Sequence, residues 1–179
     1  PGIILFAWRR LAGDPAPTRR QWISGAIVGL FLLLGGNGLV SWAEQRVESG
    51  VAALIVGTAP IWMVLFDAVM KRKWPRWQVV VGLLTGFGGI ILLVGPASLF
   101  GGQPRYDLLG MGIVMLAALF WSIGSIYSRN ADLPRSPLLG TGIEMLVGSA
   151  GLFLASLVSS EWKTFNIAAV SRDSLLGLV

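Results

Sequence analysis

One acidic residue of this chain, Glu144, lies well inside a long apolar segment. It is six residues beyond Leu138, where the segment begins, so in a helix it would lie ~9 Å from that end. Gly140 and Gly148 share its helix face at spacings of four residues, and such a face can press against a neighbouring helix and bury the carboxylate. A buried carboxyl group can bind a proton or contact an amine of a substrate. It can also form an interhelical hydrogen bond or ion pair that only orients the helix, and the sequence leaves both interpretations open.

A second group of residues interrupts the other apolar segments. Pro60 removes a backbone N–H and so frees a carbonyl group, which in lipid must be satisfied by protein or by a water-filled cavity. Thr58 lies beside it and can supply a hydroxyl as the partner. Trp121 and Ser125 share a helix face at a spacing of four residues, as expected for the wall of a cavity that holds a partly apolar, partly polar solute. With Asn37 and the acidic residue above, these four form our predicted solute and ion pathway, although Ser and Thr are also common hydrogen-bonding residues between packed helices.

The chain contains no His and no Cys, which excludes several kinds of chemistry. It has no imidazole base, no thiolate and none of the usual protein ligands of zinc or haem. A membrane-embedded enzyme would need a nucleophile and a base, or metal ligands, that converge inside the fold, and the carboxylates of this chain are scattered along it. We therefore predict a protein that is not an enzyme, with no catalytic residue, no metal and no cofactor.

These residues are distributed over segments that are long and apolar enough to cross a membrane. Hydrophobic residues make up 54% of the 179 residues and charged residues 13%, compared with about 25% charged residues in ordinary soluble domains. A spanning helix needs ~20 mostly apolar residues. The predicted spans are Trp22–Ala43, Val51–Met70, Trp77–Gly95, Leu108–Ser128 and Leu138–Ser159. Short apolar runs at Pro1–Trp8 and Ser174–Val179 are interpreted as pieces of two further spans, so we expect a fragment of an all-α transmembrane bundle, with five full and two partial helices.

Basic residues are concentrated in alternate connections between these spans. Three connections hold ten Lys and Arg residues, and the intervening ones hold four. By the positive-inside rule the basic connections, residues 9–21, 71–76 and 129–137, are predicted to be cytoplasmic. Trp74 and Trp77 lie beside the second of them, where an amphipathic ring suits the headgroup region. Despite the net charge of +5, a nucleic-acid partner is not expected, because the basic clusters lack aromatic stacking platforms on a separate domain.

Two further features are predicted to be structural. Asp67 precedes Lys71 by one helical turn near a basic connection, so we expect an ion pair at a helix end. Gly82, Gly86 and Gly89 fall on one face of their span with small-xxx-small spacing, which is typical of helices that pack closely in lipid. A phosphate-binding glycine loop would instead need an exposed loop that opens a helix. We therefore expect close helix packing through this glycine face.

Five blocks rich in glycine and apolar residues carry further information. They are residues 36–44 (GNGLVSWAE), 49–55 with 58–60 (SGVAALI and TAP), 82–93 (GLLTGFGGIILL), 120–129 (FWSIGSIYSR) and 143–146 (IEML). In this order and spacing they resemble the EamA domain of the drug/metabolite transporter superfamily, and within it the YedA-like group of inner-membrane exporters. The first three blocks resemble consecutive parts of one repeat, and the last two resemble the opening of a second repeat.

This resemblance implies ten helices arranged as two inverted five-helix repeats, with both termini cytoplasmic. Residues 1–97 would then hold the tail of helix 2 and helices 3 to 5 of the first repeat. Residues 105–179 would hold helices 6 and 7 and the start of helix 8. In the family the central cavity is lined chiefly by helices 1, 3, 4, 6, 8 and 9, whereas Glu144 would lie on helix 7. The residues that this lining favours are Asn37, Thr58, Pro60, Trp121 and Ser125.

The predicted function is export of small metabolites, amino-acid-like or drug-like solutes by alternating access around a site between the repeats, with proton coupling. The expected partners are the solute, protons, the lipid bilayer of a bacterial inner membrane and the remaining helices of the full-length chain. A non-transporting scaffold or receptor-like bundle fits the composition equally well. Such a scaffold would not need Pro60, Trp121 and Glu144 to face one water-filled space, and this feature distinguishes the two hypotheses.

Overall fold

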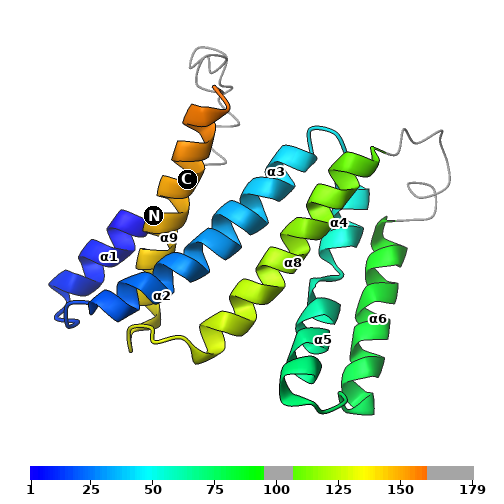
Figure 1. Ribbon diagram of the computed structural model, residues 1–179, viewed down its shortest axis with the longest axis horizontal. Helices are drawn as coiled ribbons and strands as arrows, with labels where there is room; N and C mark the ends of the chain where they lie inside the picture. The colour runs from blue at the N-terminus through cyan, green and yellow to red at the C-terminus, as the bar shows by residue number, and fades with distance from the viewer. Residues whose placement is uncertain (95–106, 161–179) are drawn as a thin grey trace.

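The computed structural model describes residues 1–94 and 107–160, and every regular element in these ranges is helical (Figure 1). The helices are α1 (Gly2–Leu11), α2 (Arg19–Gly29), η1 (Leu30–Gly38), α3 (Leu39–Ala43), α4 (Ser49–Val56), α5 (Ala59–Lys71), α6 (Trp77–Val94), α8 (Leu108–Asn130) and α9 (Pro137–Val158). Here η1 is a π-helix that continues α2 directly into α3. The predicted all-α class is confirmed.

Four of the five predicted spans are confirmed as helical segments long and apolar enough to cross a membrane. They are Arg19–Ala43, Ser49–Lys71, Leu108–Asn130 and Pro137–Val158. The other predicted span begins at Trp77 as expected, but its described apolar part, Trp77–Leu92, is shorter than the ~20 residues that a spanning helix needs. The predicted apolar run Ser174–Val179 and the proposed repeat boundary between residues 97 and 105 lie outside the described residues.

The starts of the spans have local causes. Thr18 and Gln21 form a capping box at the start of α2, in which each side chain bonds the backbone of the other residue. The carboxylate of Asp107 accepts hydrogen bonds from two backbone N–H groups in the first turn of α8. Pro137 opens α9, where its missing N–H removes no helical bond. Each span therefore begins within a few residues of its predicted position.

The helices lie side by side in a row in which the two halves of the chain alternate (Figure 1). α1 contacts α9, α9 contacts α2 and η1, and the segment α2–η1–α3 contacts α8. On its other side α8 contacts α4 and α5, and α4 contacts α6 at the far edge of the row. Both α8 and α9 are thus inserted between helices of the N-terminal half.

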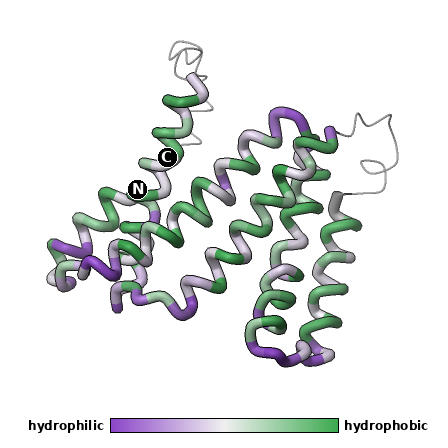
Figure 2. Tube along the Cα trace, in the orientation of Figure 1, coloured by the Kyte–Doolittle hydropathy of each residue, from purple (hydrophilic) through white to green (hydrophobic). Residues whose placement is uncertain are grey.

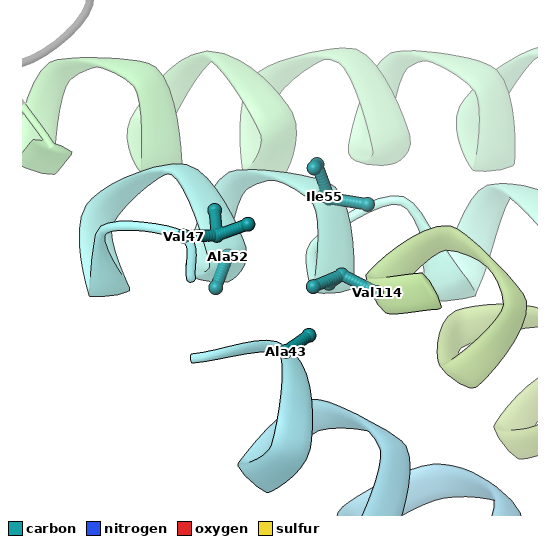
Figure 3. Close-up of a cluster of buried hydrophobic side chains, with 5 residues drawn as sticks. All are labelled: Ala43, Val47, Ala52, Ile55 and Val114. Atoms are coloured by element: carbon teal, nitrogen blue, oxygen red, sulfur yellow. The ribbon is translucent and has the colours of Figure 1, made fainter. Parts of the chain in front are cut away.

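A small apolar core joins α3, α4 and α8. Ala43, Val47, Ala52, Ile55 and Val114 are buried together there (Figure 3). Three of these five residues are at most 1% exposed. Most of the side chains are small, so the backbones approach closely. Close packing of this kind holds helices together in lipid, where apolar helices gain little from the hydrophobic effect.

Glycines bring α9 close to both of its neighbours. A Cβ atom at Gly142 would lie 3.0 Å from the backbone nitrogen of Phe6 in α1. On the other side, a Cβ atom at Gly29 of α2 would overlap the carbonyl oxygen of Glu144. In both cases the obstacle is backbone, which cannot rotate away as a side chain can. The close approach of α9 to α1 and α2 therefore depends on glycine.

The predicted close packing through Gly82, Gly86 and Gly89 is wrong for the described part of the chain. A Cβ atom at any of these three positions would have no atom within 4 Å. α6 instead contacts α4 through a large side chain: a Cβ atom at Gly57 would lie 2.5 Å from Cδ1 of Ile90. The glycine in this contact is Gly57, directly after α4, and the side chain of Ile90 in α6 fills the space beside it. The small-xxx-small spacing in α6 therefore does not mark a helix contact among the described residues.

The three basic connections lie at the same end of the bundle. Residues 12–18, 72–76 and 131–136 join their helices along the lower edge of Figure 2, where hydrophilic residues concentrate. The α3–α4 turn, residues 44–48, lies at the opposite end (Figure 1). We refer to the first end as the basic end. The three predicted basic connections therefore share one end, and the one less basic connection in the described part of the chain lies at the other, as the predicted alternation requires.

Ion pairs join helix ends there. The predicted pair is confirmed, since Oδ1 of Asp67 lies 2.9 Å from Nζ of Lys71. Asp67 is also 3.9 Å from Nη1 of Arg129, which belongs to α8.

In the turn after α1, Nε and Nη2 of Arg9 donate to the two carboxylate oxygens of Asp14 at 2.8 and 2.9 Å. These bonds from Arg9, and a further one from Ser136 before α9, hold the pKa of Asp14 below its usual value of 3.8.

We expect Asp14→Asn to destabilise the protein at neutral pH but not in acid. The pKa of this carboxyl group is lower in the folded than in the unfolded protein, so its stabilisation is complete above an unfolded-state pKa of about 3.9. It is lost as the pH falls through the folded-state pKa. Thermal unfolding of both proteins across this pH range gives the difference between their midpoints. A difference that does not shrink in acid would contradict the role given to Asp14.

Candidate functional site

The span Ser49–Lys71 is interrupted near its middle. Gly57 and Thr58 form a turn between α4 and α5. Pro60 lies in the first turn of α5, where its missing N–H is tolerated, and not in the middle of a helix as predicted. The helix breaks before Pro60 because the proline ring would clash with the carbonyl group four residues earlier.

A hydroxyl group satisfies backbone at this break. Oγ1 of Thr58 donates a hydrogen bond to the carbonyl oxygen of Ile55 at 2.6 Å. The same oxygen accepts a bond from Nε1 of Trp62 at 3.2 Å. Thr58 therefore bonds a carbonyl group at the break, but this carbonyl belongs to Ile55 and not to Val56, whose helical bond the proline removes, so the predicted partnership with the freed carbonyl is not the one observed. The two bonds also hold the last turn of α4 and the first turn of α5 in a defined geometry.

α8 supplies a second hydroxyl group to the break. Ser122 is 0% exposed, and its Oγ lies 2.9 Å from the carbonyl oxygen of Ala59, the first residue of α5. It also lies 2.7 Å from the carbonyl oxygen of Ala118 in its own helix, so its single proton is shared between the two acceptors. Ser122 thus links the broken span to α8.

Sequence reasoning favoured Ser125 and missed Ser122 as the residue that contacts the break. The signal that could have found it is a repeat of four residues. The buried residues of α8 include Gly110, Val114, Ala118, Ser122 and Ile126. This spacing marks the face of a helix that packs against a neighbour. Ser125 lies off this face and is only half-buried.

We expect Ser122→Ala to destabilise the protein by about 0.6 kcal/mol, the average for interhelical hydrogen bonds in a membrane protein, and by at most about 1.7 kcal/mol. The carbonyl group of Ala59 would lose its bond to α8 and keep only the helical bond within α5. Ser128→Ala is the matched control, because among the described residues Oγ of Ser128 bonds only the carbonyl group of Ser125, within α8. The stability of both variants would be measured by unfolding in increasing concentrations of a denaturing detergent, with helix content followed by circular dichroism. Equal stability of the two would show that Ser122 does not support the break.

Trp121 packs against the π-helix on the other side of α8. A Cβ atom at Gly36 would lie 2.5 Å from Nε1 of Trp121, and one at Gly35 would lie 2.8 Å from Cγ of Phe120. The ring of Phe120 meets that of Phe31 edge-on, with 5.4 Å between the ring centres. Two adjacent glycines therefore admit two aromatic side chains of α8. Single π-turns are often found at functional sites, and η1 extends over nine residues.

Asn37, the next residue of η1, lines a cavity of about 640 Å³. The cavity lies between the end of the first span, the N-terminal half of α8 and the C-terminal part of α9, away from the basic end. Its polar lining residues are Asn37, Ser41, Gln45, Ser156 and Ser159, and its apolar ones include Leu34, Trp42, Ile113 and Leu152. Apolar walls with a few polar groups are typical of sites for small molecules.

One wall of this cavity is held by a charged residue of the α3–α4 turn. The guanidinium of Arg46 lies 4.8 Å from the centre of the Trp42 ring, a cation–π contact. Nη1 of Arg46 also lies 3.7 Å from Oδ2 of Asp107, the capping residue of α8. These contacts connect the α3–α4 turn to α8 beside the cavity.

Glu144 lies half-buried on α9. At Gly148 a Cβ atom would lie 2.5 Å from Cδ1 of Leu33, whereas at Gly140 the nearest atom is Cδ of Pro134 at 3.7 Å. The predicted glycine face therefore packs tightly at its Gly148 end only. Among the described residues no basic side chain lies within 4 Å of the carboxylate.

The predicted pathway residues do not surround a single cavity in the described part of the chain. Asn37 lines the 640 Å³ cavity, and Trp121 contacts the glycine that precedes Asn37. Thr58 lies at the helix break, on the side of α8 that faces α5. Ser125 and Glu144 are half-buried on α8 and α9. The arrangement consists of a helix break and a cavity on two sides of α8.

Comparisons with known proteins agree with one another. Residues 2–95 match the EamA-like transporter family. The "uncharacterized inner membrane transporter YedA" of Escherichia coli (strain K12) is 34% identical over 163 residues, which cover 89% of this chain and 50% of that protein. The "uncharacterized transporter YoaV" of Bacillus subtilis is 27% identical, over 97% of this chain and 60% of its own length.

A further relative carries a more specific name. The "probable terminal-alkyne amino-acid exporter" of Streptantibioticus cattleyicolor is 26% identical, over 79% of this chain and 46% of its own length. The chain spans about half the length of the curated relatives it matches. No solved structure gives a significant match.

Proposed function

Since the chain belongs to the EamA-like transporter family and its helices are those of an integral membrane protein, we propose that the full-length protein is a secondary active exporter. Its cargo would be small metabolites, amino-acid-like or drug-like solutes, and it would work by alternating access coupled to protons. We assign it no enzymatic activity. The relative YedA is named as an inner-membrane transporter, and we propose the same membrane for this protein, with the basic end in the cytoplasm.

The proposed architecture of the full-length protein is ten helices in two inverted repeats. Residues 1–97 would come from the first repeat and residues 105–179 from the second. The alternation of the two halves in one row supports this proposal, because α8 and α9 each contact helices of the N-terminal half. Repeats that interlock in this way would place a solute site between them and not within either one.

The observation that carries the proposal, besides the family, is the broken span α4–α5. Discontinuous helices near the middle of the bilayer form the substrate sites of many secondary transporters. Irregular backbone at this depth is tolerated where it is buried in protein or lines a water-filled cavity. The break at Gly57 and Thr58 is partly satisfied by hydroxyl groups, and the π-helix η1 lies on the opposite side of α8. A non-transporting scaffold does not require either feature. The feature expected to distinguish the two hypotheses, Pro60, Trp121 and Glu144 around one space, is not found in the described part of the chain.

Amino-acid-like solutes are the first class to test. One relative is named as a probable exporter of an amino acid with a terminal alkyne, a solute with polar and apolar parts. The cavity at Asn37 likewise combines apolar walls with hydroxyl and amide groups. Glu144 is the proposed proton-binding group, because it is a carboxylate within a span, where such residues are costly and typically mark ion pathways or proton relays.

Efflux from proteoliposomes tests this proposal. The full-length protein would be reconstituted in liposomes loaded with a panel of amino acids and, separately, with cationic drugs. We expect efflux of at least one amino acid, and faster efflux when an imposed pH gradient drives protons in the opposite direction. Liposomes without protein are the control. No flux of any solute, from protein shown to be folded, would favour the scaffold hypothesis.

A further inference from the structure

Four cationic side chains line one pocket at the basic end. The pocket has a volume of about 290 Å³ and lies between the ends of α5 and α8, the connection 72–76 and the start of α6. Its basic groups are Lys71, Lys73, Arg76 and Arg129, and its acidic group is Asp67. If these charged side chains served only to anchor helix ends at the membrane surface, they would not need to line a common pocket. Here two helices and a connection place them around one space, with a net charge of +3.

Asp67 orders this pocket without neutralising it. Its carboxylate lies 2.9 Å from Nζ of Lys71 and 3.9 Å from Nη1 of Arg129, so it holds one cation from α5 and one from α8. Within the described ranges Lys73 and Arg76 form no ion pair. Both belong to the connection between α5 and α6 and are exposed. Two cations are therefore held in place and two are available to an anion.

An apolar groove continues from the pocket along the outside of the bundle. It has a volume of about 210 Å³ and is lined by Leu65, Ala68, Val69, Lys73 and Trp74. Ala68, Lys73 and Trp74 also line the basic pocket, so the two spaces are adjacent. Trp74 is 94% exposed and Val69 69% exposed. A Trp ring suits the headgroup region of a bilayer, and an apolar groove beside it is suited to an acyl chain.

We propose that the basic pocket and the apolar groove together bind one anionic phospholipid, with its phosphate among the four cations and an acyl chain along the groove. The net positive charge is complementary to a phosphate, and guanidinium groups bind phosphate through charge-assisted hydrogen bonds. Basic pockets at the ends of membrane helices are suited to anionic headgroups. A free phosphate would occupy the pocket but leave the groove empty. The site is separate from the cavity at Asn37, which lies away from the basic end.

Native mass spectrometry of the full-length protein tests the proposal. The purified, delipidated protein would be titrated with phosphatidylglycerol or phosphatidylcholine, and the retained lipid would be counted. The test variant is Lys73→Gln with Arg76→Gln. The control is Arg19→Gln with Arg20→Gln, which removes two charges at the basic end from residues that do not line the pocket. A third titration adds inorganic phosphate as a competitor against phosphatidylglycerol.

We expect phosphatidylglycerol to be retained in preference to phosphatidylcholine. Each cation near the membrane surface contributes about fivefold in affinity, so the test variant should lose about 25-fold and approach the level of phosphatidylcholine. The control variant should bind as the unchanged protein does. Equal loss in both variants, or equal retention of the two lipids, would overturn the proposal in favour of diffuse charge at the basic end. Complete displacement by inorganic phosphate would overturn it in favour of a free-anion site.

Discussion

Glu144→Gln is expected to reduce efflux driven by a pH gradient to the level of liposomes without protein. Glutamine keeps the size and hydrogen-bonding capacity of the side chain but cannot bind and release a proton. Glu144 is half-buried within the span Pro137–Val158, where a carboxylate is costly and is usually retained for a function. The measurement is efflux from proteoliposomes containing the full-length protein, with an imposed gradient, for the solute that the unchanged protein exports.

Two controls separate proton coupling from a general loss of activity. Glu44→Gln makes the same chemical change at an exposed residue of the α3–α4 turn, and it should leave efflux unchanged. Exchange of labelled for unlabelled solute without a gradient should continue in Glu144→Gln, because exchange needs no net movement of protons. Gradient-driven efflux that survives the substitution would reduce Glu144 to a residue that only orients α9.

Gly29→Ala is expected to destabilise the full-length protein by about 1–3 kcal/mol, the usual cost of overpacking. The added Cβ atom would overlap the carbonyl oxygen of Glu144 and lie 3.0 Å from its Cα atom. Because both obstacles are backbone, α2 and α9 must move apart to admit a methyl group. We expect a lower thermal midpoint, and detergent unfolding at a lower denaturant concentration than for the unchanged protein.

Gly86→Ala is the matched control, because it makes the same change in a helix interior. In the described part of the chain a Cβ atom at Gly86 would have no atom within 4 Å. Alanine also favours a helix over glycine by up to about 1 kcal/mol, so this variant should be as stable as the unchanged protein or slightly more stable. A Gly86→Ala variant that loses more stability than Gly29→Ala would contradict the packing described for α2, α6 and α9.

The predicted pathway residues differ in how much of their environment can be predicted from the sequence. The altered backbone at Thr58 and Pro60 could be predicted, because proline lacks a backbone N–H group wherever it occurs and a nearby hydroxyl group can bond the backbone instead. Ser122 was missed because it depends on a neighbour: its proton bridges to Ala59, which is 63 residues away along the chain. Asn37, a predicted pathway residue, lines the cavity. The other walls of the cavity come from α8 and α9, and no local sequence pattern connects these helices to Asn37.

The class of the protein, most of its spans, the distribution of charge over its connections and its family could all be predicted from the amino-acid sequence. These properties are local, because each residue contributes to the cost of crossing hydrocarbon or facing the cytoplasm through its own polarity and charge. The contacts between helices became known from the folded arrangement. α8 lies between the first and second spans, Ser122 reaches the helix break, and in the described part of the chain Gly29 makes a close contact whereas Gly86 does not. In lipid the hydrophobic effect does not favour one apolar helix over another as a packing partner. Helix contacts therefore depend on the fit of whole helix surfaces, which the spacing of residues along one helix does not specify.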